Sequence, residues 1–498
     1  MKLSPLLAAA VVSAAPFFAV AEVTQKPVSL EDCVQLALQH NFDIKLQRFG
    51  PRLTDLDLST AYAPYDPTFF TSAGQRFGRS ESLVVPSATF NPPSNENWSD
   101  TYSTGLGGYL PTGLRYDFYG DIRRNQTTIL PSGQTGSFDY SPDAGINLTQ
   151  PLLKNAWIDS TRWTIALNRL TLKSNYETVR GQVIDTLRDV EVAYYNLISA
   201  AENVQVQVKA VEVAERFLLE TRKRVEVGAM APLEAKSAEA EVARRQSDLV
   251  TGRQILADNE RALKRLLDDD FTHSADTMLT PSAKLGIPKV VVNRKDSWGR
   301  AFERRPDYQQ QKITLEQQKV TLRFNRNQLF PQLDLTGSYG VTGRSTEIGP
   351  AINELGNRSN PNYAWGIKLT IPLDNLAARN GYKKAKLQQE QLLLKFKQTE
   401  QSIMIQIDID VRAVESAAEK IKATRQAREY AEAALDAEQQ KLASGKSTNY
   451  QVLQFQRDLT AAQTAEISAL ADYNRALAQL SHDEGSSIER HSIKVDLR

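Results

Sequence analysis

The sequence predicts a mainly helical protein with a smaller share of β-strands, built from two copies of one unit. Two long stretches, about residues 152–267 and from residue 373 onward, contain few residues that break helices. Short motifs recur in the same order in both halves of the chain, and strand-like alternation precedes each long stretch. Each unit is therefore expected to contain a helix, strands and a long helical hairpin.

Apolar or small residues recur through the first long stretch at alternating steps of four and three. They are Val183, Leu187, Val190, Tyr194, Leu197, Ala201, Val204, Val208 and Val211. This spacing is the 3.5-residue period of a coiled coil. A helix over residues 154–227 would be about 110 Å long. Gly228 and Pro232 interrupt it, and a second helix runs to about Leu267, which predicts an antiparallel hairpin with its tip near Gly228.

The hairpin occurs twice. Ser199-Ala200-Ala201-Glu202 is matched by Ser416-Ala417-Ala418-Glu419, 217 positions later, and at that offset Gly228 falls on Gly445. Several such matches in one order indicate an internal duplication. The first repeat covers residues 22–270 and the second covers 297–485, with a connecting segment, 271–296, between them.

The N-terminal residues 1–21 have the pattern of a signal peptide, with Lys2, an apolar run and the cleavage motif Ala19-Val20-Ala21. A membrane anchor is the alternative, but Ser13 and Pro16 interrupt the apolar run. The net charge of +1 provides no basic field for nucleic acid.

The first repeat opens with a capped helix start at Ser29-Leu30-Glu31-Asp32. Strands are expected over about 68–150, followed by the helical hairpin over about 154–267. Four runs alternate in this region, so the first repeat can supply four strands where the second supplies two.

The second repeat opens with a helix interrupted at Arg305-Pro306-Asp307. Two strands are expected over about 333–371, separated by a Gly/Asn/Pro-rich loop, with Tyr363 and Trp365 as candidate interfacial aromatics. Their length suits a tilted membrane strand, although a half-buried hairpin of a soluble domain would look the same. The helical hairpin covers about 376–482. The polar tail, 486–498, is expected to be loosely held.

Motifs for catalysis are absent from the sequence. The four histidines lack metal-ligand spacing, and there is no Cys-x-x-Cys pair, phosphate loop or nucleophile elbow. Residues 402–412 alternate like a strand, but the matching part of the first repeat has helical spacing, so we expect a helix. The sequence predicts no enzyme, no metal and no cofactor.

The constellation resembles the TolC-like outer-membrane efflux protein family, which supplies the exit channel of tripartite efflux and type I secretion systems. The motifs that carry the resemblance are Leu30-Glu31-Asp32, Ala37-Leu38, Asn41, Arg305-Pro306-Asp307, Phe330-Pro331-Gln332-Leu333, Ile371-Pro372-Leu373, Val227-Gly228-Ala229, Ser444-Gly445-Lys446 and Asp472-Tyr473-Asn474. The departure is the extra strand-like sequence between Phe77 and Phe138, which leaves the strand count open.

The resemblance implies a homotrimer in the outer membrane of a Gram-negative bacterium. Each subunit would give four strands to one shared transmembrane β-barrel, and the coiled helices would form a periplasmic α-helical barrel girdled by the connecting segment. The channel would serve efflux of small molecules or secretion of proteins, with a periplasmic adaptor (membrane fusion) protein and an inner-membrane transporter as partners. The alternative is a periplasmic coiled-coil scaffold or adaptor without a barrel.

Two groups of candidate site residues follow. The resemblance implies that the hairpin tips, Val227, Gly228, Ala229, Ser444, Gly445 and Lys446, dock the adaptor, although they could be simple turns. Gly228 and Gly445 are expected to have positive φ. Asp436, nine residues before Gly445, occupies the place of an acidic residue that lines the periplasmic aperture in the family. Asp436 and Glu438 are therefore candidate lumen carboxylates, with a solvated outer helix face as the alternative.

Overall fold

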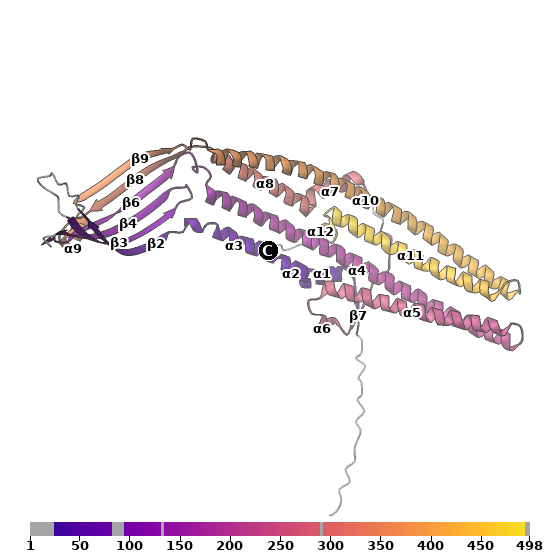
Figure 1. Cartoon of the computed structure of the whole chain (residues 1–498). Helices are drawn as coiled ribbons and strands as arrows, with labels where there is room; N and C mark the ends of the chain where they lie inside the picture. Colours follow the sequence, from indigo (N-terminus) through magenta and orange to yellow (C-terminus); the bar gives the residue numbers. More distant parts are fainter. Residues whose placement is uncertain (1–23, 82–93, 131–133, 289–291, 494–498) are drawn as a thin grey trace, which may run out of the picture. The chain divides into compact units, whose positions relative to one another are not determined.

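The computed structural model describes residues 24–81, 94–130, 134–288 and 292–493, so the expected signal peptide lies outside the described residues. The chain divides into two compact units. We call the first the helical unit; it contains the described parts of residues 1–46, 182–301 and 404–495. We call the second, residues 47–181 and 302–403 where described, the sheet unit. Two helices, α4 (Ser160–Glu226) and α10 (Leu376–Ala443), contribute to both (Figure 1).

The helical unit contains the later parts of α4 and α10 and the helices that return from their ends. α5 (Pro232–Leu267) follows α4 after a five-residue turn, and α11 (Asn449–Asp483) follows α10 in the same way. The shorter elements are β1 (Thr24–Val28), α1 (Leu30–His40), α6 (Phe271–Ser274), β7 (Thr277–Pro281), α7 (Arg294–Arg304) and α12 (Ser487–Arg490).

The predicted heptad seam forms the core of the helical unit. Five seam residues are at most 1% exposed: Val183, Leu187, Val190, Tyr194 and Leu197. They pack with Val34 of α1 and Leu263 of α5. Each such side chain contributes about 1.5–3 kcal/mol by leaving water, so this seam is the main reason that α1 and α5 pack on α4.

Side-chain hydrogen bonds hold the two ends of α1. The Ser29 hydroxyl accepts from the Asp32 N–H at 3.1 Å, and the Asp32 carboxylate accepts from the Ser29 N–H at 3.1 Å, which confirms the predicted cap. Asn41 follows α1, and its side-chain amide donates to the Leu266 carbonyl at 3.2 Å. Its side-chain oxygen also caps the first turn of α2 (Phe42–Gln47), so Asn41 fixes this corner against α5.

A parallel strand pair joins the start of the chain to the connecting segment. β1 pairs with β7, with Thr24 opposite Thr277 and Val28 opposite Pro281. The Tyr194 hydroxyl donates to the Val28 carbonyl at 3.2 Å, which attaches the pair to α4. The sequence analysis missed both strands, because a five-residue strand with a distant partner leaves no local pattern.

The segment after α11 contradicts the expectation of a loose tail over its described part, 486–493. Ser487 is 1% exposed, and the Nε2 of His491 lies 2.5 Å from a carboxylate oxygen of Glu191, itself buried in α4. Ile488 and Ile493 pack against the core of the helical unit. Two isoleucines and a paired histidine are enough to hold this otherwise polar segment in place.

The isoleucines of α10 lie on two faces of one helix, as the helical reading of residues 402–412 requires. Ile403 and Ile407 are at most 2% exposed, whereas Ile405 and Ile409 are 62% and 54% exposed. Residues four apart share a face of an α-helix, and residues two apart do not. One face of α10 is therefore core, and the other is apolar without a partner among the described residues.

The helices of the sheet unit are α3 (Phe49–Thr60), α8 (Pro306–Asn327) and the early parts of α4 and α10. Trp163 of α4 stacks on Phe324 of α8, and Tyr308 of α8 stacks on Phe396 of α10, each at 5.0 Å between ring centroids. α8 therefore packs against both long helices. It begins at the predicted interruption, with Pro306 in the first turn, where its missing N–H leaves no bond unmade.

One antiparallel sheet runs in the order β2-β3-β4-β6-β8-β9 (Figure 1). The strands are β2 (Thr68–Ser80), β3 (Ser94–Tyr109), β4 (Arg115–Leu130), β6 (Asp139–Pro151), β8 (Gln332–Thr342) and β9 (Asn360–Thr370). A two-residue strand, β5 (Gln134–Thr135), pairs only with β4. The first repeat thus supplies four long strands and the second supplies two. This total of six exceeds the four per subunit that the family resemblance implies.

A short helix, α9 (Ile348–Gly356), lies where the sequence analysis expected only a loop between β8 and β9. Ala351 is fully buried, close to Gly343 at the end of β8. Pro350 falls in the first turn of α9, where proline is tolerated. The glycines and prolines of this region resemble a loop, which hid the helical spacing of its apolar residues.

A partly buried ionic cluster joins α4 to α11 in the helical unit. The Nε2 of His482 lies 2.6 Å from Asp185, and its Nδ1 lies 3.1 Å from Asp483. Burial alone would lower the pKa of His482, but the hydrogen bonds to these two carboxylates outweigh it and raise the pKa to about 9. His482 is therefore a cation at neutral pH.

The raised pKa predicts a pH-dependent stability. Protonated His482 contributes fully below about pH 6.5, and this contribution is lost as the pH rises through about 9. The loss is up to about 3 kcal/mol per chain. Between pH 6.5 and 9.5, the unfolding midpoint of the purified protein should fall further in the native chain than in His482→Gln. An identical fall in both would contradict this assignment.

Candidate functional site

The sheet has one apolar face that no described part of the chain covers. The strand register places one large side chain from every long strand in a single row: Phe69, Leu106, Phe118, Ile146, Tyr339 and Tyr363. Alternate residues along each strand face the same side. Phe69 and Tyr363, at the two edges, are 71% and 79% exposed.

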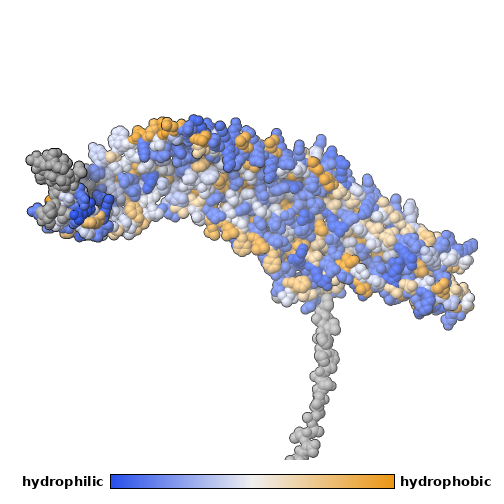
Figure 2. Space-filling view, in the orientation of Figure 1, coloured by the Kyte–Doolittle hydropathy of each residue, from blue (hydrophilic) through white to orange (hydrophobic). Residues whose placement is uncertain are grey.

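β9 shows the alternation most clearly. Trp365, Ile367 and Leu369 are 78%, 62% and 56% exposed on the apolar face. Lys368 and Thr370 lie on the opposite face by the strand periodicity. Figure 2 shows hydrophobic residues gathered over this part of the sheet unit. Such a strand suits a sheet with lipid on one side and water on the other.

The opposite face is polar and carries glycines beneath aromatic rings. The row that follows the apolar one is Phe70, Gly105, Tyr119, Gly145, Gly340 and Asn362. A Cβ on Gly105 would overlap the Phe70 ring, and one on Gly340 would lie 3.0 Å from the Tyr119 hydroxyl. Glycine at these positions leaves room for the aromatic side chains to lie against this face of the sheet.

Charged residues mark one limit of the apolar band. Asp100 of β3 accepts a hydrogen bond from Gln75 of β2 at 2.9 Å and forms an ion pair with Arg124 of β4. Gln75 lies six residues beyond Phe69 on the same face of β2. Beyond this point, Phe77 of β2 and Trp98 of β3 form a ring pair on the same face, with centroids 4.7 Å apart, so β3 extends past the charged residues.

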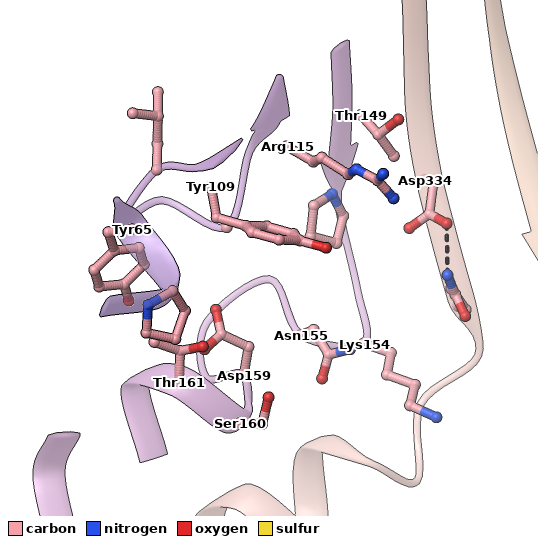
Figure 3. Close-up of a pocket in the computed structure, with 15 residues that line it drawn as sticks. Tyr65, Tyr109, Arg115, Thr149, Lys154, Asn155, Asp159, Ser160, Thr161 and Asp334 are labelled. Carbon is pink, nitrogen blue, oxygen red and sulfur yellow. Dashed lines mark hydrogen bonds between the residues drawn. The ribbon is translucent and has the colours of Figure 1, made fainter. Parts of the chain in front are cut away.

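A pocket of about 440 Å³ lies where the sheet meets the start of α4 (Figure 3). Arg162 organises it, because its guanidinium donates to the Asp159 carboxylate at 2.9 Å and to the Asn155 carbonyl at 2.7 Å. A second carboxylate in the pocket, Asp334, accepts from Gln332 at 2.7 Å. Since both carboxylates already have partners, the pocket is best explained as the joint between sheet and helices.

The two hairpin tips share one backbone geometry. Gly228 and Gly445 have φ values of 74° and 72°, which confirms the predicted positive φ. The N–H groups of Gly228 and Ala229 donate to the carbonyls of Val225 and Arg224 at 3.0 and 2.8 Å, the bonds of a Schellman motif, and the Gly445 tip repeats them. An added Cβ would meet nothing within 4 Å at either glycine, so conformation rather than space requires glycine.

The residues proposed to dock an adaptor are all accessible. Val227 is 77% exposed, and the other five, Gly228, Ala229, Ser444, Gly445 and Lys446, are also exposed. Behind the tips, the two hairpins contact each other through one apolar cluster: Phe217, Ala238, Leu435, Val452 and Leu453. The exposed turns therefore stand on a common packed base.

An ion pair that the sequence analysis missed also joins the hairpins near this base. Glu241 of α5 is 3% exposed and accepts from Arg457 of α11 at 2.7 Å and from Arg245 at 2.9 Å. Burial tends to raise the pKa of Glu241, but Arg457 and its neighbours hold that pKa below its usual value. Removal of one partner would leave an uncompensated buried charge and would strongly destabilise the folded protein. The ion pair therefore favours one arrangement of the hairpins.

The structure separates the two candidate aperture carboxylates. Asp436 is exposed and accepts a 2.9 Å hydrogen bond from the side-chain amide of Gln440 in the next turn. Glu438 is 5% exposed and accepts from Ser447 at 2.5 Å and from Lys441 at 3.0 Å, contacts that hold its pKa below the usual value. Residues two apart lie on different faces of a helix, so Asp436 and Glu438 have different surroundings. The role of either residue as a lumen carboxylate stays a prediction.

Neither metal ligation nor helical membrane crossing is apparent in the described part of the chain. Across residues 24–81, 94–130, 134–288 and 292–493, no group of three or more His, Cys, Asp and Glu side chains could hold a metal ion. Among the described helices, none combines the length and apolar composition needed to cross a bilayer.

A sheet with one uncovered apolar face, joined to long coiled helical hairpins, defines a subunit of an outer-membrane channel with a helical extension. The model of the family described as outer membrane efflux protein matches residues 120–268 and 298–482, which is more than half of the chain. The chain belongs to the outer membrane efflux protein family.

Solved structures with this fold are outer-membrane proteins. The CmeC outer membrane channel of Campylobacter jejuni matches with a TM-score of 0.65 at 16% identity, covering 94% of this chain and 90% of that one. The open state of the MtrE channel of Neisseria gonorrhoeae matches with a TM-score of 0.63 at 16% identity, covering 92% and 89%. The outer membrane protein VceC of Vibrio cholerae matches with a TM-score of 0.63 at 15% identity, covering 92% and 96%. Among curated protein sequences, none matches significantly.

Family membership makes this chain an outer-membrane efflux channel that extends into the periplasm. It favours the channel over the periplasmic scaffold or adaptor. The helices agree, because only residues 227–231 separate α4 from α5, which leaves no strand module inside that hairpin.

The exposed apolar face of β9 predicts that charge is not tolerated there. Ile367→Arg or Leu369→Arg should cost about 2–4 kcal/mol where the residue lies at mid-bilayer depth, and should reduce the fraction of folded, heat-modifiable protein in outer membranes. Thr370→Arg, beside Lys368 on the polar face, is the matched control and should assemble normally. Equal assembly of all three variants would show that this face does not meet lipid.

Proposed function

We propose that three copies of this chain form a passive exit duct. An inner-membrane pump would drive it through a periplasmic adaptor, and the cargo would be small molecules or proteins. The observation that carries this proposal is the single open sheet of six long strands with an uncovered apolar face. One chain does not close such a sheet, and lipid does not tolerate an open edge.

The helices support association of copies. α3 exposes Phe49, Leu53 and Leu56 at 54%, 60% and 64%, spaced four and three residues apart. The early part of α10 exposes Leu387 and Leu394 at 65% and 69%, seven residues apart. Both patterns have the spacing of a coiled-coil seam that no described part of the chain covers, and a neighbouring copy would supply the partner.

A passive duct needs no catalytic residues, and we propose that the protein is not an enzyme. The clusters of titratable groups described above, around His482 and Glu241, pair helices with each other. Their side chains have structural partners, which supports a transport role for the chain.

The duct is tested by purified protein in a planar bilayer. Single-channel conductance, together with a heat-modifiable trimer on a gel, is the expected result. A water-soluble monomer without conductance would overturn the proposal.

The tips test the adaptor contact. Val227→Glu or Lys446→Glu should abolish export in cells while leaving the trimer and its conductance intact, because both side chains are exposed and support no packing. Lys422→Glu is a matched charge reversal on the exposed surface of α10, away from the tip, and should export normally. If export persists in both tip variants, the tips are turns without a docking role.

The aperture prediction is tested first at Asp436, the exposed one of the two candidate carboxylates. In a trimer, one inward carboxylate per chain makes a ring of three that raises the local cation concentration. Asp436→Ala and then Asp436→Lys should progressively lower cation selectivity in a planar bilayer and weaken block by multivalent cations from the periplasmic side. Glu438→Gln should leave selectivity unchanged, since Glu438 is engaged with Ser447 and Lys441. Unchanged selectivity in both Asp436 variants would place this residue on an outer face.

A further inference from the structure

We infer that the β3–β4 hairpin is part of the barrel wall, so that the exit pore has six strands from each of three copies, eighteen in all. The pore is then wider than one built from four strands per copy. This inference rests on the proposed trimeric duct and adds the size class of its cargo.

Both strands of the β3–β4 hairpin pair with neighbouring strands of the sheet over most of their length. β3 pairs with β2 from Gly107, opposite Thr68, to Asn95, opposite Ser80. β4 pairs with β3 on one side and with β6 on the other. β2 is hydrogen-bonded to β3 alone in the described sheet, so β2 joins the wall only through this hairpin.

Both strands of the hairpin have the same two faces as the rest of the sheet. On β3, Tyr102 and Leu106 lie on the apolar face and are 52% and 38% exposed, while the polar Ser103 between them faces the other side. On β4, Phe118 is 48% exposed on the apolar face and alternates with Asp117. Leu106 and Phe118 share the row that ends at Tyr363 of β9. A hairpin that stood in water above the membrane would not require an apolar face at this level.

Closure of the barrel is also consistent with six strands. Because every neighbouring pair is antiparallel, β2 and β9 run in opposite directions. The free edge of β2 therefore meets the free edge of β9 of the next copy as an antiparallel pair, which outer-membrane barrels require. Barrel diameter grows roughly in proportion to strand number, so eighteen strands give about one and a half times the diameter of twelve. Cargo that is too wide for a twelve-stranded pore but narrower than an eighteen-stranded pore would pass only through the eighteen-stranded one.

Cysteine labelling in whole cells tests the position of the hairpin. The only native cysteine, Cys33, is fully buried, and burial raises its pKa to about 12, so it gives little background. Ser103→Cys should react with a membrane-impermeant maleimide, and Thr104→Cys, on the apolar face, should react only with a lipid-soluble one. Reaction of both positions with the impermeant reagent, or of neither, would overturn the inference.

A deletion tests the width. Removing residues 94–130 leaves β2 and β6 antiparallel, so the remaining four strands keep their order. In planar bilayers, polyethylene glycols added from the extracellular side should enter the full-length pore up to about one and a half times the radius admitted by the deletion variant. An equal cut-off would overturn the inference. If the deletion variant does not fold, the labelling result decides.

The proposed duct and the eighteen-stranded wall are contradicted by different results. Absence of a trimer or of conductance in the full-length chain removes the proposed function. A conducting trimer in which residues 103 and 104 do not alternate in labelling leaves the duct in place and removes only the eighteen-stranded wall.

Discussion

The edges of the sheet are the constraint on which the rest of this structure depends. β2 and β9 each have one hydrogen-bonded neighbour in the described chain, and their outer backbone groups need partners wherever water is absent. An exposed apolar face suits contact with lipid, and in lipid the edges of a sheet must be paired. These two demands together account for a chain that does not complete its own membrane domain.

The helices, like the sheet, expose apolar surface that needs a partner. α10 buries one stripe inside its own chain, as Ile403 and Ile407 show, and leaves another apolar stripe exposed, as Ile405 and Ile409 show. A helix with two apolar stripes is suited to a wall of helices, in which every helix has neighbours on both sides. The ion pair between the buried Glu241 and the partly exposed Arg457 favours one way for the two hairpins of one chain to meet.

Matching positions of the two repeats show which side chains both hairpins bury and which residues belong to one repeat only. At the offset of 217, Thr221 corresponds to Glu438, and both are buried, at 2% and 5%. Leu219 corresponds to Asp436, and both are exposed. Glu438 therefore occupies a position that the hairpin packs in both copies, whereas the charge of Asp436 is placed on a surface that the other copy leaves apolar.

The sequence by itself determined the repeats, the helical hairpins, the capped start at Ser29 and the glycines of the tips, because each depends on neighbours within one or two turns. It did not reveal that β1 pairs with β7 or that Ile488 and Ile493 anchor the end of the chain, since those contacts join residues far apart. It left the strand count open, because alternation marks a strand but does not say which strands share a sheet. Only the tertiary structure decided that β3 and β4 lie between β2 and β6 and that Glu438 is buried in its hairpin while Asp436 is exposed. The direction that a side chain faces depends on what packs against its helix, and that is a property of the folded chain.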